Sequence, residues 1–154
     1  MADPIYDVYW EGPYAWDKRQ VTPRDRHVLY AIYGTHRVYG PQSLLYIGRT
    51  ESSGGKRLKD HDWWVKEESA PVSFHLASIG EFKDWPTWES IGAYPKATRA
   101  LVQVIESLLI HAHQPAYNAQ SLQAPAKSRP FRVFNTGHYG SLLPEVSYRY
   151  YADP

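Results

Sequence analysis

The stretch that decides the fold runs from VLYAIY (residues 28–33) to LLYIG (residues 44–48). Both segments are rich in leucine, β-branched and tyrosine residues, a composition typical of β-strands. The residues between them, 34–43, include Gly40-Pro41 and predict a turn or loop. Because so short a connection joins antiparallel neighbours, the two segments predict a β-hairpin.

Three further patterns follow the hairpin along the chain. Ser52 and Ser53 are candidate N-caps of a helix predicted over residues 55–66. Apolar residues alternate with others from Val72 to Ala77 and predict a third strand. Residues 96–113 predict the strongest helix, because apolar side chains recur there at three- and four-residue spacing. These patterns together predict a small antiparallel sheet with helices packed against it.

The two ends of the chain carry weaker patterns. Residues 1–26 have no clear period and predict an irregular arm, held down by its tyrosines and tryptophans. Residues 119–130 have the composition of a linker, residues 131–134 predict a short strand, and residues 135–140 predict a turn. We therefore expect one α+β domain with irregular N- and C-terminal extensions.

Composition narrows the class of protein. The chain has 154 residues, 43% of them hydrophobic and 21% charged, which is typical of one soluble globular domain. It contains no cysteine, and this excludes disulfides, thiolate zinc sites and a cysteine nucleophile. No apolar run approaches the roughly 20 residues of a membrane helix, and the first residues lack the pattern of a signal peptide. We expect a cytoplasmic protein that does not enter a membrane.

Charged and aromatic residues are unevenly distributed. The net charge is only +1, yet residues 18–59 hold nine basic side chains against two acidic ones. A locally positive surface fits a polyanion such as nucleic acid, whereas scattered solvated charge is the plainer interpretation. The 13 tyrosines and 6 tryptophans, Trp63-Trp64 among them, could stack on bases. We expect most of them to cover the core instead.

Residues that could take part in catalysis or metal binding occur one after another along the predicted strands and helices. They are Tyr46-Ile47-Gly48 on the second strand, Arg49 directly after it, Arg57 and His61 on the next helix, Glu106 on the last helix, and Asn118 beyond Pro115. This ordered set, which spans residues 28–118, resembles the GIY-YIG nuclease family. The first signature, Gly-Ile-Tyr, does not occur, and its tyrosine is either Tyr30 or Tyr33.

The resemblance implies both a fold and an activity. The fold is a three-stranded antiparallel sheet flanked by helices over residues 27–120, with an N-terminal arm (1–26) and a C-terminal extension (121–154) packed on the same domain. The activity is a divalent-metal-dependent endonuclease that cuts DNA and leaves 5′-phosphate and 3′-hydroxyl ends. The segments on either side of this domain are too short for a separate targeting domain, which favours a restriction-like or stand-alone enzyme. Cutting both DNA strands with a single active site would require a homodimer or two successive binding events.

The resemblance also assigns roles to residues that bind the phosphate and the metal. Glu106 would hold a single Mg²⁺ or Mn²⁺ ion, because carboxylate oxygens are the ligands these cations prefer. Arg57 would offer its fork of donors to the phosphoryl oxygens. His61, four residues further on, would face the same way and share that work. Asn118 would support the site through hydrogen bonds.

Tyrosines would handle the attacking water. Tyr30 or Tyr33, with Tyr46 nearby, would orient the water and remove its proton. A free tyrosine has a pKa near 10, so a tyrosine base at neutral pH needs about 3–4 kcal/mol of phenolate stabilisation. Arg49 or the metal could supply it.

Each of these residues also has a plainer interpretation. Arg57 and His61 could lie on an exposed helix face, and Glu106 could be a surface glutamate. The tyrosines could simply fill the pleats of a sheet. The alternative function is a catalytically weak nucleic-acid-binding or protein-interaction module on the same scaffold. A nuclease requires all these groups to converge, whereas a binding module requires only the basic surface.

Overall fold

The computed structural model describes residues 2–18, 27–50, 58–82 and 98–152. The predicted hairpin is confirmed, with strands β2 (Leu29–His36) and β3 (Gly40–Arg49) paired antiparallel. The strands extend well into the region predicted as a loop, which leaves only residues 37–39 as a turn. The third strand, β4 (Ser73–Phe82), is also confirmed and pairs with β2 on the side away from β3.

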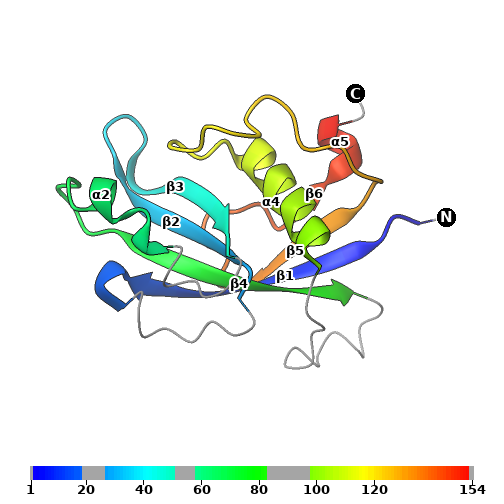
Figure 1. The fold of residues 1–154 in the computed structure, drawn as a ribbon, viewed down its shortest axis with the longest axis horizontal. Coiled ribbons are helices and arrows are strands. Elements are labelled where there is room, and N and C mark those ends of the chain that lie inside the picture. The colour runs from blue at the N-terminus through cyan, green and yellow to red at the C-terminus, as the bar shows by residue number, and fades with distance from the viewer. Residues whose placement is uncertain (1, 19–26, 51–57, 83–97, 153–154) are drawn as a thin grey trace.

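The predicted fold class is wrong. The structure is mostly β, a six-stranded mixed sheet that curls strongly into a half-barrel, and not a three-stranded sheet flanked by helices. Its strand order is β3-β2-β4-β1-β5-β6 (Figure 1). The three additional strands are β1 (Ile5–Ala15), β5 (Arg132–Gly137) and β6 (Glu145–Ser147). Strands β1 and β6 lie in segments for which no strand was predicted. Strand β5 confirms the short strand predicted over residues 131–134 and continues through residue 137, where a turn was predicted.

Strand β1 escaped prediction because its sequence lacks the alternation of a half-buried strand. It lies inside the sheet, antiparallel to β4 and parallel to β5, and its register shifts between Glu11 and Tyr14. Its polar residue Asp7 is fully buried and accepts a hydrogen bond from Thr136 on β5. A polar residue in a central strand is stable when a tertiary partner satisfies it, and local sequence does not reveal that partner.

Among the described residues, α4 (Arg99–His113) is the only substantial helix. Thr98 caps it by accepting a hydrogen bond from the backbone N–H of Leu101. The short helices are η1 (Trp16–Lys18), α2 (Asp62–Val65) and α5 (Tyr148–Ala152). The part of the predicted 55–66 helix that precedes residue 58 lies outside the described residues. No described helix has the length and apolar character needed to cross a membrane.

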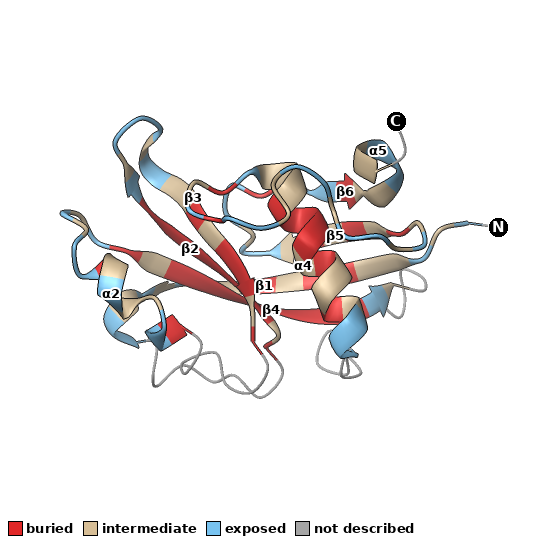
Figure 2. Cartoon of the chain, turned by 45° about the horizontal axis from the view of Figure 1, so that its top comes forward, coloured by how far each residue is buried: buried red, intermediate tan, exposed pale blue. Residues whose placement is uncertain are grey.

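The two faces of the sheet have separate cores. Helix α4 lies across one face (Figure 1), where Ile105, Leu108 and Leu109 pack against strand residues such as Ile47. On the other face, Tyr30 and Phe74 belong to a smaller cluster that α2 and the residues before it help to cover. Buried residues accordingly run along the strands and the inner side of α4 (Figure 2). The candidate site lies at the β2–β3 end of the sheet, next to this smaller cluster.

Candidate active site

Three of the predicted site residues, Tyr30, Tyr46 and His61, form one cluster on the α2 side of the sheet. The phenol oxygen of Tyr30 lies 2.8 Å from Nε2 of His61. The Tyr46 ring packs on both, 6.0 Å from the Tyr30 ring and 4.5 Å from the His61 ring between centroids. Tyr30 is fully buried and Tyr46 is half-buried. Two strands and the segment before α2 therefore hold a phenol and an imidazole in hydrogen-bonding contact.

The glycine of the Tyr-Ile-Gly tripeptide makes room for this cluster. Gly48 pairs directly with Tyr30 across the β2–β3 ladder, so both positions face the same side of the sheet. A Cβ at Gly48 would lie 2.4 Å from both Cζ and Oη of Tyr30. Only glycine lets the ring lie flat over the neighbouring strand and reach His61.

Trp64 determines the tautomer of His61. The indole N–H of Trp64 lies 3.1 Å from Nδ1 of His61. Because an indole nitrogen can only donate, Nδ1 must accept, and the proton of the neutral imidazole then resides on Nε2. His61 therefore donates to the phenol oxygen of Tyr30. A donor aimed at that oxygen favours negative charge on it.

Tyr33, the other candidate for the first signature, lies elsewhere. Its ring packs edge-on against His75, with centroids 5.1 Å apart, and helps to line a separate pocket of about 440 Å³ with His138 and Ser141. Burial raises the pKa of the Tyr33 phenol, which Ser141 opposes only in part. A raised pKa makes a phenol harder to ionise. The geometry distinguishes the two tyrosines, because it is Tyr30 whose oxygen contacts His61.

Arg49 and Glu106 form an ion pair at the end of β3. Their closest atoms, Nη1 of Arg49 and Oε1 of Glu106, are 3.0 Å apart. The Glu106 side chain is only 15% exposed, because it projects from the side of α4 that approaches β3. Arg49 directly follows Gly48, the residue that pairs with Tyr30, so the ion pair lies one residue further along β3. Side chains alternate in a strand, and Arg49 faces the α4 side of the sheet rather than the Tyr30 side.

Asn118 stabilises the edge strand. Its side-chain amide donates to the carbonyl oxygen of Ile47 at 2.9 Å and accepts from the N–H of the same residue at 3.0 Å. The backbone N–H groups of Ala116 and Tyr117 donate to the carbonyls of Leu44 and Leu45. This segment therefore covers the free edge of β3, and Asn118 supports the strand that carries Tyr46 and Gly48.

A pocket of about 570 Å³ opens beside the cluster. Tyr46 and His61 form part of its wall, together with Trp64, Tyr117 and acidic side chains around α2. Neither Arg49 nor Glu106 is among its described lining residues. The pocket and the Arg49–Glu106 pair thus lie on different sides of the edge strand.

The donor set suits a cation that keeps most of its own water. No group of three or more histidine, cysteine or carboxylate side chains that could hold a metal exists among the described residues. A single carboxylate such as Glu106 fits Mg²⁺, which binds proteins through one or two carboxylates and completes its shell with water and phosphate. Arg57, the predicted phosphate ligand, lies outside the described residues.

The sequence analysis did not identify Trp64 as part of this cluster. We expected Trp63-Trp64 to cover the core, and Trp64 does pack beside the smaller cluster, but Trp63 is 71% exposed. The available signal was spacing, since residues three apart on a helix lie on one side. Comparison of the chain with protein-family models, curated proteins and solved structures gives no match.

Proposed function

We propose that the protein is a divalent-metal-dependent endonuclease of the GIY-YIG type that hydrolyses DNA phosphodiester bonds. The observation that carries the proposal is the hydrogen bond between Tyr30 and His61, whose direction Trp64 determines. A hydrogen bond donated to a phenol oxygen favours the phenolate, and a phenolate can take a proton from water. The expected products carry 5′-phosphate and 3′-hydroxyl ends.

In this mechanism the Tyr30 cluster prepares the nucleophile. Tyr30, as the phenolate, would remove a proton from the attacking water and become a neutral phenol. His61 would stabilise the phenolate before this transfer, because it donates to the phenol oxygen. Tyr46 packs against both rings and restricts their orientation. Such positioning lowers the barrier because the reacting groups do not have to be ordered during the reaction.

The Arg49–Glu106 pair would serve the phosphate. Glu106 would hold Mg²⁺ or Mn²⁺, and Arg49, which already contacts this carboxylate, would orient it. When bound, the metal neutralises the charge that develops on the phosphoryl oxygens. Arg57 would add its guanidinium to those oxygens, and Asn118 would keep β3 in place. Tyr30 and Arg49 face opposite sides of the sheet, so these described groups do not converge in one cleft, and the proposal requires the phosphate to contact both of them around the Arg49 end of β3.

A plasmid assay tests the proposal. Purified protein should nick or cut supercoiled DNA with Mg²⁺ or Mn²⁺ and not with excess EDTA, and sequencing of the ends should find 5′-phosphates. Glu106→Gln should lower the rate by about 100-fold or more. The matched control is Glu145→Gln, because Glu145 is also paired with an arginine but lies on β6. Unchanged cutting by Glu106→Gln would refute the mechanism.

A second candidate is a nucleic-acid-binding module without catalysis. The Arg49–Glu106 pair favours it, because an ion pair can exist for stability alone. This candidate requires DNA binding by the wild-type protein, no cleavage with either metal, and a loss of stability in Glu106→Gln. The same set of measurements therefore separates the two functions.

A further inference from the structure

The pocket beside His61 has the features of a site for a nucleobase. We propose that it binds one unpaired base that carries hydrogen-bond donors on its Watson–Crick edge, guanine above all, next to the phosphate to be cut. This inference rests on the proposed nuclease function and adds substrate selectivity to it. Its argument depends on the aromatic walls, the carboxylates and the position of the pocket.

The walls of the pocket are aromatic. Trp64 and Tyr117 meet edge to face with ring centroids 5.2 Å apart, and Tyr46 and His61 form the side nearest the candidate site. Trp63 also lines the pocket and is 71% exposed. Aromatic rings bind unstacked bases through their faces, at about 1–3 kcal/mol per base. Solvent-exposed tryptophan next to a pocket is therefore well placed to stack on a base that leaves the helix.

Carboxylates give the pocket its selectivity. Glu67, Glu68 and Asp60 line it, and Glu68 accepts a hydrogen bond from the Tyr117 hydroxyl at 3.3 Å. An ionised carboxylate only accepts hydrogen bonds, and its two oxygens match the adjacent N1–H and N2–H donors of guanine. Thymine has a single donor, N3–H, on the same edge, flanked by two carbonyl oxygens that a carboxylate repels. Readout of an extruded base through this edge is a known mode of recognition.

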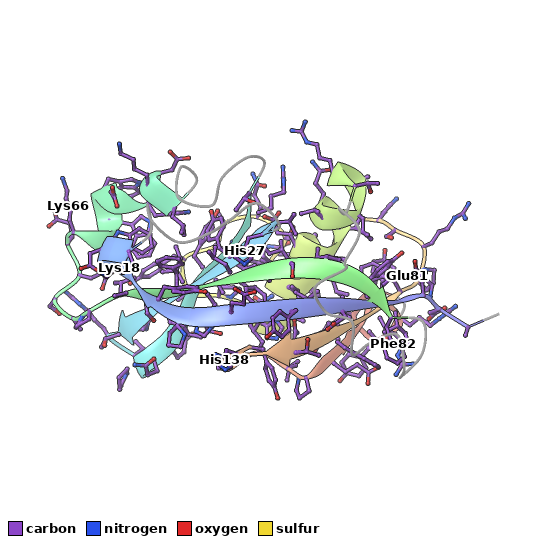
Figure 3. All side chains as sticks on the ribbon, turned by 90° about the horizontal axis from the view of Figure 1, so that it is seen from below. Lys18, His27, Lys66, Glu81, Phe82 and His138 are labelled. Carbon is purple, nitrogen blue, oxygen red and sulfur yellow. The ribbon has the colours of Figure 1, made fainter. Side chains whose placement is uncertain are left out.

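The charge pattern places the base, and not the phosphate, inside the pocket. The three carboxylates repel phosphate oxygens, whereas Lys59 and Lys66 are exposed next to them in sequence. Figure 3 shows Lys66 at the outer end of the molecule, beside α2. A base can therefore enter the pocket while the phosphate backbone of the nucleic acid remains outside, near Lys59 and Lys66.

The position of the pocket favours a nucleotide over a cationic peptide. Tyr46 and His61 belong both to the pocket wall and to the cluster proposed to activate water. A group bound there would be adjacent to the reacting phosphate, as a neighbouring base of the substrate is. A paired base cannot present its Watson–Crick edge, so the proposal implies cleavage near an unpaired nucleotide.

The experiment measures binding without cleavage. The Glu106→Gln protein in EDTA is titrated with the hexamers dTTGTTT and dTTTTTT, and binding is followed by tryptophan fluorescence. The guanine hexamer should bind at least about tenfold tighter, which is about 1.4 kcal/mol. Glu68→Gln should reduce this ratio because glutamine also donates to thymine, and Trp63→Ala should weaken both hexamers.

Glu81→Gln is the control. Glu81 is an exposed carboxylate at the opposite end of the molecule from Lys66 (Figure 3), and its substitution should change neither affinity. Equal binding of the two hexamers, or tighter binding of hexalysine than of dTTGTTT, would overturn the inference. Because no metal is present, failure here leaves the cleavage test unaffected, and guanine-selective binding without any cleavage would refute only the nuclease proposal.

Discussion

Trp64, His61 and Tyr30 form a chain of hydrogen bonds whose direction follows from elementary donor and acceptor rules. The indole can only donate, and this places the imidazole proton opposite Tyr30. Tyr33, although only three residues away, lies in a different pocket with His75. At the residue scale, the two tyrosines that the sequence left as alternatives therefore have different surroundings.

Replacing one tyrosine hydroxyl at a time tests this difference. Tyr30→Phe should reduce metal-dependent DNA cleavage by about 10²–10⁴-fold, because it removes the proposed base. The loss of one hydrogen bond should cost only about 1 kcal/mol in the free energy of unfolding. Tyr33→Phe is the matched control and should cut DNA at nearly the wild-type rate. A larger loss in Tyr33→Phe than in Tyr30→Phe would exclude Tyr30 as the base.

At the scale of elements, two side chains connect segments by hydrogen bonds to backbone groups outside the strand-to-strand pairing. Asn118 completes the edge of β3 by pairing with both backbone groups of Ile47. His113, at the end of α4, donates through Nδ1 to the carbonyl of Leu109 and accepts through Nε2 from the N–H of Leu143. The first link supports the candidate site and the second holds α4 to the segment between β5 and β6.

Loss of the Asn118 amide should destabilise the protein. Asn118→Ala leaves the buried N–H and C=O of Ile47 without these partners, at a cost of about 2–4 kcal/mol in the free energy of unfolding. Asn118→Asp should also destabilise the protein, because it retains the acceptor but puts a carboxylate oxygen against the carbonyl oxygen of Ile47 at a buried position. Urea unfolding of both variants measures the effect. Equal midpoints for Asn118→Ala and the wild type would show that the amide contributes nothing to β3.

His113 should make stability depend on pH. Burial lowers the pKa of His113 below its ordinary value of 6.5, and the hydrogen bond to Leu109 opposes this only in part. Its contribution to stability is therefore complete above about pH 6.5 and is lost as the pH falls toward the lowered pKa, because the unfolded chain binds the proton more readily. The slope is at most about 1.4 kcal/mol per pH unit for one histidine.

Urea unfolding from pH 8 to pH 5 checks this dependence. His113→Gln should remove part of the decline below pH 6.5. A further part should remain, because burial also lowers the pKa of His75. If His113→Gln and the wild type lose stability in parallel, His113 is not the group responsible.

At the scale of the whole molecule, β1 connects the two ends of the sheet. It lies between β4 and β5, and its pairing with β5 joins residues more than 120 positions apart in the chain. The buried side chain of Trp10 donates to Asn135 on β5 at 2.9 Å. The two ends of the chain thus build one sheet with the central strands, and they are not appendages to it.

Deletion of residues 1–15 should therefore abolish cooperative folding. Without β1, strands β4 and β5 lose their shared partner and both expose unpaired edges. Near-ultraviolet circular dichroism and thermal melting should show the loss of a single sharp transition, and a synthetic peptide of residues 2–15 should restore it. A truncated protein that retains the wild-type spectrum and transition would show that β1 is dispensable.

The sequence by itself determined the elements whose signal is local. The β2–β3 hairpin, strand β4 and helix α4 follow from alternation, turn residues and helical spacing within short windows. The order of Tyr46, Arg49, His61, Glu106 and Asn118 predicted a nuclease site, which remains a prediction. Only the tertiary structure decided that β1 lies inside the sheet and that Tyr30, and not Tyr33, contacts His61.

The physical reason is the range of the interactions. A strand with polar residues such as Asp7 is stable only when a distant segment supplies Thr136, and no short window contains both. The side of the sheet on which the Tyr30 side chain lies depends on the register between β2 and β3. A shift of one residue would place each side chain on the opposite side. Local patterns specify which segments become strands, whereas pairing across the whole chain decides their order and what their side chains touch.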